Sequence, residues 1–188
     1  MVAQLEKKAS PRQRLLAAAN ELFYDEGIHA VGIDRLIERA GVAKGSLYHN
    51  FSGKDEIVKE YLLGRHASWT SRVEEQVAMA SGPTAKILTV FDALGTLFAE
   101  PGWRGCAFVN AVAEAPTDGP EMVAAANFRA WLHMLFGNLT VQLPVQNPQE
   151  LADQLVIIYD GAVASAQMDK SPVAAATAKT LAAIVVGA

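Results

Sequence analysis

Residues 33–51, IDRLIERAGVAKGSLYHNF, decide how this chain folds. The first part carries apolar side chains at the spacing of one helical face, namely Ile33, Leu36, Ile37 and Ala40. Gly41 is expected to end that helix. Leu47 and Phe51 are four residues apart, which predicts the buried side of a second short helix. Two short helices joined by a glycine-containing turn have the sequence form of a helix-turn-helix, at about residues 32–51.

The second short helix has an outward side that packing alone does not explain. Glycine costs about 1 kcal/mol relative to alanine inside a helix, so Gly45 needs another reason, such as close approach of the backbone to DNA. The side chains around it offer hydroxyl, imidazole and ammonium donors, which suit phosphate oxygens and base edges. The second helix of a helix-turn-helix lies in the major groove. We therefore predict a DNA-binding site made of Lys44, Gly45, Ser46, Leu47, Tyr48, His49 and Lys54, with the Leu47 side chain fixed inward.

Helical spacing recurs along the rest of the chain and strand-like alternation does not, so the fold class is predicted to be all-α. Ser10, Pro11 and Gln13 predict a capping box that opens the first helix, and Gly27 is expected to end it in a left-handed conformation. Ser52 and Asp55 predict a second capping box. The helix that follows is expected from residue 54 to 65 or on to 79. Further helices are expected at about 83–99, 103–113, 121–138, 148–168 and 172–186, with a loop over 115–120.

Composition limits the class of protein. Of 188 residues, 51% are hydrophobic and 19% charged, which predicts a globular chain. One cysteine, Cys106, excludes an internal disulfide, and the start of the chain lacks the apolar stretch of a signal peptide. No apolar run is long enough to span a membrane, so a cytoplasmic protein is expected. The net charge of −4 arises after residue 65, because residues 1–65 hold ten Lys/Arg and nine Asp/Glu. The first part can therefore meet phosphates.

Residues from about 11 to 60 resemble the DNA-binding domain of the TetR family of one-component transcriptional regulators. The residues that carry the resemblance keep their order and spacing: Leu22, Phe23, Gly27, Ile33, Leu36, Ile37, residues 40–42, residues 44–49, Phe51, Lys54 and Ile57. Residues 104–114, RGCAFVNAVAE, resemble a segment found in one branch of that family. Gly32 and Ala43 depart from the usual Thr or Ser caps, and each loss costs about 1 kcal/mol. Asn50 replaces a frequent aromatic residue.

The resemblance implies a helix-turn-helix DNA-binding domain over residues 1–60 and a ligand-binding and dimerisation domain over 61–188. It implies a repressor that binds a palindromic double-stranded DNA operator as a homodimer and is released by a small-molecule effector. Residues 148–188 add a physical reason for the dimer, because small side chains let helices approach closely. Apolar bulk there comes from Leu151, Leu155, Ile158, Leu181 and Ile184. An ordinary intramolecular core is the alternative for these helices.

Aromatic and aliphatic residues at helical spacing predict a largely apolar effector pocket. Its predicted lining is Phe91, Leu94, Phe98, Phe108, Asn110, Phe128, Trp131, Leu132, His133 and Leu135, and plain core is the alternative for each. Cys106 is expected to be a small buried hydrophobe. The four histidines lack metal-ligand spacing, so neither a metal nor another cofactor is predicted.

Two other classes of function remain as alternatives. A helical ligand- or protein-interaction module would share the fold but lack DNA activity. An α-helical enzyme would need a nucleophile with a base, or a metal set, and the chain has no G-x-S-x-G, no H-E-x-x-H and no phosphate loop. Glu114 and Asp118 lie beside a proline-rich loop, where a solvated or capping role accounts for them. The chain is therefore predicted not to be an enzyme.

Overall fold

A computed structural model describes residues 9–115 and 118–188. The predicted all-α class is confirmed, since these residues form helices and no strand. The helices are α1 (Pro11–Glu26), α2 (Ile33–Ala40), α3 (Lys44–Asn50), α4 (Lys54–Met79), α5 (Pro83–Phe98), α6 (Ala107–Glu114), α7 (Pro120–Thr140), α8 (Pro148–Asp169) and α9 (Val173–Val185). Residues 1–8 of the predicted DNA-binding domain, and Pro116 and Thr117 of the predicted loop, lie outside the described residues.

The start of α1 confirms the predicted capping box. The Ser10 hydroxyl accepts from the backbone N–H of Gln13 at 3.2 Å, and the Gln13 side chain accepts from the Ser10 N–H at 2.9 Å. Gly27 ends the helix with a positive φ of 93°, but its ψ of 149° is extended and not left-handed helical. The second predicted capping box is wrong. Glu56, not Asp55, reaches back to the Ser52 N–H and hydroxyl, at 2.6 and 2.8 Å, and Gly53 is the residue before the helix.

The helix-turn-helix has the predicted bounds. Gly41 adopts φ 60° and ψ 45°, the left-handed conformation that favours glycine, and its N–H satisfies carbonyls at the end of α2. Gly32 and Ala43 give α2 and α3 no side-chain cap, as the departures in sequence predict. These helices pack with α1 and the start of α4 around buried side chains, namely Leu15, Leu22, Phe23, Leu36, Leu47, Phe51 and Ile57.

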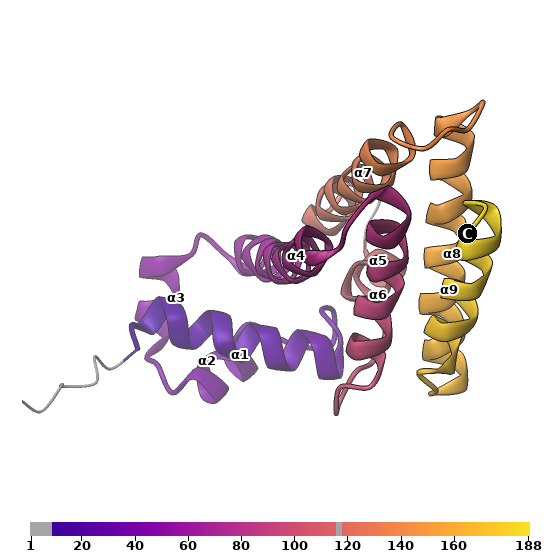
Figure 1. Cartoon of the computed structure of the whole chain (residues 1–188). Helices are drawn as coiled ribbons and strands as arrows, with labels where there is room; N and C mark the ends of the chain where they lie inside the picture. The colour runs from indigo at the N-terminus through magenta and orange to yellow at the C-terminus, as the bar shows by residue number, and fades with distance from the viewer. Residues whose placement is uncertain (1–8, 116–117) are drawn as a thin grey trace, which may run out of the picture.

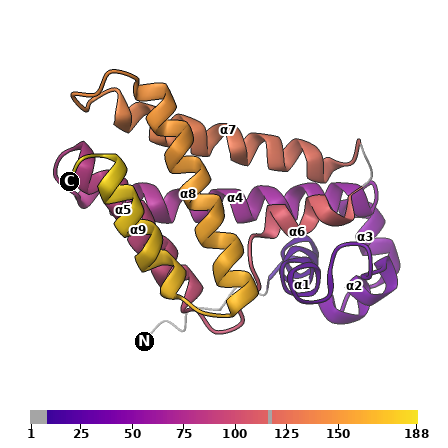
Figure 2. The same ribbon diagram turned by 90° about the vertical axis from the view of Figure 1, so that its right-hand side faces the viewer.

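The long helix α4 joins helices α1–α3, called the head below, to helices α5–α9, which make up the larger part of the molecule. α4 runs unbroken through the predicted boundary at residue 60, so it contributes to both parts. Figure 1 shows α1–α3 at one end and α8 with α9 at the other. Along the larger part, α4 and α7 lie side by side, α5 packs on α9, and α7 packs on α8 (Figure 2). The buried apolar side chains form one continuous core. No helix among the described residues is long and apolar enough to cross a membrane.

Candidate functional site

Helix α3 presents a polar outer face. Tyr48 is 53% exposed, and Lys44, Gly45 and His49 are exposed beside it. Ser46 and Lys54 are half-buried. Leu47, included among the predicted DNA-binding residues, is fully buried, so its side chain anchors α3 and cannot touch DNA.

Gly45 has no role in the packing of the protein itself. A Cβ built there would meet no atom within 4 Å, and the residue lacks the positive φ that would require glycine. The space above it is therefore open to another molecule.

Replacing Gly45 with alanine is expected to raise the free energy of unfolding by up to about 1 kcal/mol, because alanine favours the helix. Affinity for operator DNA should nevertheless fall, since the methyl group fills the space that the backbone needs. Thermal unfolding and mobility-shift titration measure the two effects. Gly64→Ala in α4 is the matched control, because that position is also helical with no atom within 4 Å of the added Cβ. Equal operator affinity for both variants would contradict the role given to Gly45.

Carboxylates already pair with the cations around the helix-turn-helix. The Lys44 ammonium donates to Asp34 at 3.1 Å, and this hydrogen bond, with the attraction of the two charges, raises the pKa of Lys44. Other exposed pairs join Arg39 to Glu21 at 2.5 Å and Arg12 to Glu60 at 2.9 Å. Exposed ion pairs are weak, so phosphate can displace these carboxylates.

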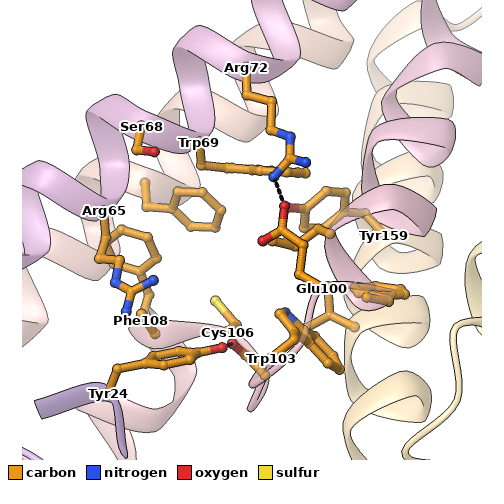
Figure 3. A pocket seen from close by; sticks show the side chains of 16 residues that line it. Tyr24, Arg65, Ser68, Trp69, Arg72, Glu100, Trp103, Cys106, Phe108 and Tyr159 are labelled. Atoms are coloured by element: carbon orange, nitrogen blue, oxygen red, sulfur yellow. Dashed lines mark hydrogen bonds and ion pairs between the residues drawn. The ribbon is translucent and has the colours of Figure 1, made fainter. Parts of the chain in front are cut away.

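The larger part of the chain contains a cavity of about 160 Å³. Figure 3 shows side chains from several helices and from the loop 99–106 pointing into it. Each of six helices contributes an aromatic ring, namely Tyr24 of α1, Trp69 of α4, Phe98 of α5, Phe108 of α6, Phe128 of α7 and Tyr159 of α8. Phe98, Phe108 and Phe128 were among the predicted lining.

The other predicted pocket residues do not line this cavity. Phe91, Leu94 and Leu132 are fully buried in the helical core, where neighbouring side chains leave no space. The Trp131 indole donates to Glu74 at 3.2 Å, and His133 lies near Asp153 on the surface. Leu135 packs partly buried against the core. Asn110 borders a smaller cavity beside α1 and donates to the Arg104 carbonyl at 3.2 Å.

Several residues that line the cavity were not predicted from the sequence. Arg65, Trp69 and Arg72 stand at the i, i+4, i+7 spacing of one face of α4, a signal the sequence did contain. Tyr24, Glu100 and Trp103 could not be found this way, because they come from another helix and a loop.

Charged and polar side chains also line the cavity. Arg72 donates to Glu100 at 2.5 Å, with the two side chains 31% and 45% exposed. The Arg65 guanidinium lies 4.1 Å from the centre of the Tyr24 ring, a cation–π contact. The Cys106 thiol points into the space in Figure 3. Burial raises the pKa of Cys106, so the sulfur stays a neutral thiol near pH 7.

The cavity is connected to the head through α1. The Tyr24 hydroxyl donates to the Gly105 carbonyl at 3.0 Å and accepts from the Arg104 N–H at 2.7 Å. The Arg104 guanidinium binds the carbonyl of Asp25. Glu114 at the end of α6 accepts from the backbone N–H of His29, in the turn between α1 and α2, at 3.0 Å, so it caps no helix there. Segment 104–114 therefore lies between the cavity and helices α1–α3.

Comparison with known proteins identifies the arrangement. Residues 15–61 match the family model of bacterial regulatory proteins, tetR family. A solved structure of SCO4454, a TetR-family transcriptional regulator from Streptomyces coelicolor, superposes with a TM-score of 0.89. It is 31% identical, and the match covers 98% of this chain and 92% of that one.

Two curated relatives from Mycolicibacterium smegmatis match the head and its surroundings. The transcriptional activator FasR is 52% identical over 55 residues, which is 29% of this chain and 25% of FasR. The transcriptional repressor KstR2 is 34% identical over 84 residues, 44% of this chain and 40% of KstR2. The match thus spans between a quarter and two fifths of these relatives. All three proteins are transcriptional regulators, which confirms the prediction that the chain is not an enzyme. Similarity to SCO4454 over nearly the whole of both chains, with the matched head, shows that the chain belongs to the TetR family of transcriptional regulators.

Proposed function

We propose that the protein is a repressor that binds a palindromic operator as a homodimer and leaves it when a small molecule enters the cavity. One observation carries the DNA-binding part: α3 buries Leu47 completely while Lys44, Tyr48 and His49 stand exposed around a glycine with open space above it. The similarity to the repressor KstR2 supports the direction of regulation, and such a regulator would act in the cytoplasm.

The test is selection of bound genomic fragments, followed by mobility-shift titration at several salt concentrations. We expect specific binding whose logarithm falls with log salt by about 0.9 for each phosphate contacted. Binding that is absent, or insensitive to salt, would favour the helical interaction module without DNA activity. A reporter gene downstream of the operator then separates a repressor from a transcriptional activator such as FasR.

Replacing Asp34 with asparagine is expected to raise operator affinity by about two- to fivefold, since the exposed ion pair that competes with phosphate is weak. The Lys44 ammonium would be released to phosphate, and one negative charge near DNA would be removed. Mobility-shift titration at low salt measures the change. Glu75→Gln, an exposed position in α4, alters the net charge equally and should leave affinity nearly unchanged. No gain with Asp34→Asn would contradict the placement of Lys44 at the phosphates.

The proposed dimer uses the outer faces of α8 and α9. Leu151 and Leu155, predicted to contribute to the interface, are buried within the protomer against neighbouring helices. Exposed apolar side chains on these two helices include Ile157 on α8, 70% exposed, and Leu181 and Ile184 on α9, both among the predicted interface residues and the latter 68% exposed. Small exposed residues such as Gly161 and Ala164 lie along the same helix. Pairing of two such faces would bury this apolar surface around a two-fold axis.

Release from DNA is proposed to act through Tyr24. This side chain both lines the cavity and bonds the 104–105 backbone, so a ligand that moves the loop also moves α1. The two recognition helices must sit about 34–36 Å apart, or a multiple of that, to enter successive major grooves. An effector that binds better to another spacing of the heads shifts the population away from the DNA-bound form.

A further inference from the structure

The size and walls of the cavity limit its ligand. Its volume of about 160 Å³ is close to that of an engineered apolar cavity of about 150 Å³ that accommodates one benzene molecule. Aromatic side chains surround the space from six helices, and Trp103 adds a ring from the loop. Aromatic walls favour stacked or edge-on contacts with a planar ring. A ligand of about one aromatic ring therefore fits the apolar part of the site.

The charges of the lining favour an anion. Its charged side-chain types are two arginines, Arg65 and Arg72, and one glutamate, Glu100, so the cations outnumber the carboxylates by one. Burial raises the pKa of the Cys106 thiol and of the Tyr24 and Tyr159 phenols, so these groups are neutral near pH 7. A carboxylate on the ligand would balance the excess positive charge.

The hydrogen-bonding groups of the lining also favour a ligand that accepts hydrogen bonds, as an anion does. Two buried N–H donors of the lining, Arg65 Nε and Trp69 Nε1, make no hydrogen bond of normal geometry within the described part of the chain. The phenols of Tyr61 and Tyr159 lie close to the Arg65 and Trp69 side chains, so a ligand acceptor would compete with these weaker contacts. Arg72 has five N–H donors and directs one of them to Glu100. Because Glu100 is 45% exposed, its carboxylate can turn into water at small cost when another acceptor takes its place.

We propose that the effector is a small aromatic carboxylate, with its ring among the aromatic walls and its carboxylate on Arg72 in place of Glu100. This inference rests on the proposed function, because it names the ligand of the same cavity. It also gives the ligand a route to the head. Glu100 belongs to the loop that carries the Arg104 and Gly105 backbone groups bonded to Tyr24, so its displacement acts on α1.

Tryptophan fluorescence tests the proposal without DNA, because Trp69 and Trp103 line the cavity. The probes are benzoate and phenylacetate, their amides, and benzyltrimethylammonium as a cation of similar size. We expect at least one carboxylate to quench saturably and to bind about tenfold or more tightly than its own amide, since charge-assisted hydrogen bonds are the strong ones. The proposal is overturned by equal affinity of acid and amide, by tighter binding of the cation, or by no saturable binding of either acid.

Two variants separate ligand recognition from folding. Arg72→Gln should remove the preference for acid over amide. Glu100→Gln should strengthen carboxylate binding, because it replaces the competing carboxylate with an uncharged and weaker acceptor. Arg39→Gln is the matched control, since Arg39 forms an equally short exposed pair with Glu21 in the head, and it should bind benzoate as the parent does. An unchanged preference in Arg72→Gln, or weaker carboxylate binding in Glu100→Gln, contradicts the proposal. DNA binding is measured separately by mobility shift, so failure of the ligand class and failure of the regulator function remain distinguishable.

Discussion

Replacing Tyr48 with alanine is expected to lower operator affinity by roughly 10- to 100-fold while leaving the fold intact. The side chain is 53% exposed on α3, so its removal should change the free energy of unfolding by at most about 0.5 kcal/mol. A side chain that contacts DNA contributes about 1–3 kcal/mol to binding. Lys44→Ala should show a similar loss and, because it removes a phosphate contact, a shallower dependence of affinity on salt.

Mobility-shift titration and thermal unfolding measure the two quantities on the same samples. Lys86→Ala in α5 is the control, because that lysine lies in the larger part of the chain, outside the helix-turn-helix. Loss of folding in Tyr48→Ala would show that the ring belongs to the core. Unchanged operator affinity in both α3 variants would remove α3 from the DNA interface.

Replacing Ile157 with glutamate is expected to abolish the dimer at micromolar concentrations. The side chain is 70% exposed in the protomer but would be buried in the proposed α8–α9 interface. An unpaired buried charge costs about 3–5 kcal/mol, which raises the dimer dissociation constant by more than about 100-fold. Operator affinity should fall as well, since one protomer contacts only a half-site. Sedimentation equilibrium gives the association state directly.

Val123→Glu is the matched control, because Val123 is 63% exposed on α7 and outside the proposed interface. It should remain a dimer with unchanged operator affinity. A parent protein that sediments as a monomer, or an Ile157→Glu variant that stays dimeric, would contradict the proposed interface.

The sequence was most informative where one residue type permits few conformations. Gly41 takes the left-handed conformation that ends α2, and the buried pair Leu47 and Phe51 fixes which side of α3 faces outward. The capping contact of Ser52 was misassigned, because Asp55 and Glu56 both lie within reach and only the geometry of the turn selects Glu56.

The cavity could be predicted only in part. Periodicity tells which side chains point inward, but not whether they meet space or other side chains. Phe91 and Phe108 both lie on the apolar face of their predicted helices. In the structure, Phe91 stacks on Phe136 in the core, whereas Phe108 borders the cavity. The Arg72–Glu100 pair in the cavity wall was not predicted. The two residues are 28 positions apart in the sequence and meet only through the packing of α4 with the end of α5.

The most direct test of the central claim is lysine acetylation of the unaltered protein with and without its selected operator, read by mass spectrometry. We expect operator DNA to protect Lys44 strongly from acetylation and to protect Lys54 as well. Lys86 and Lys170, in the larger part of the molecule, should be acetylated as fast as in the free protein. Lys44 that is acetylated equally fast in the free protein and in the saturated complex would contradict the claim that the outer face of α3 lies on DNA.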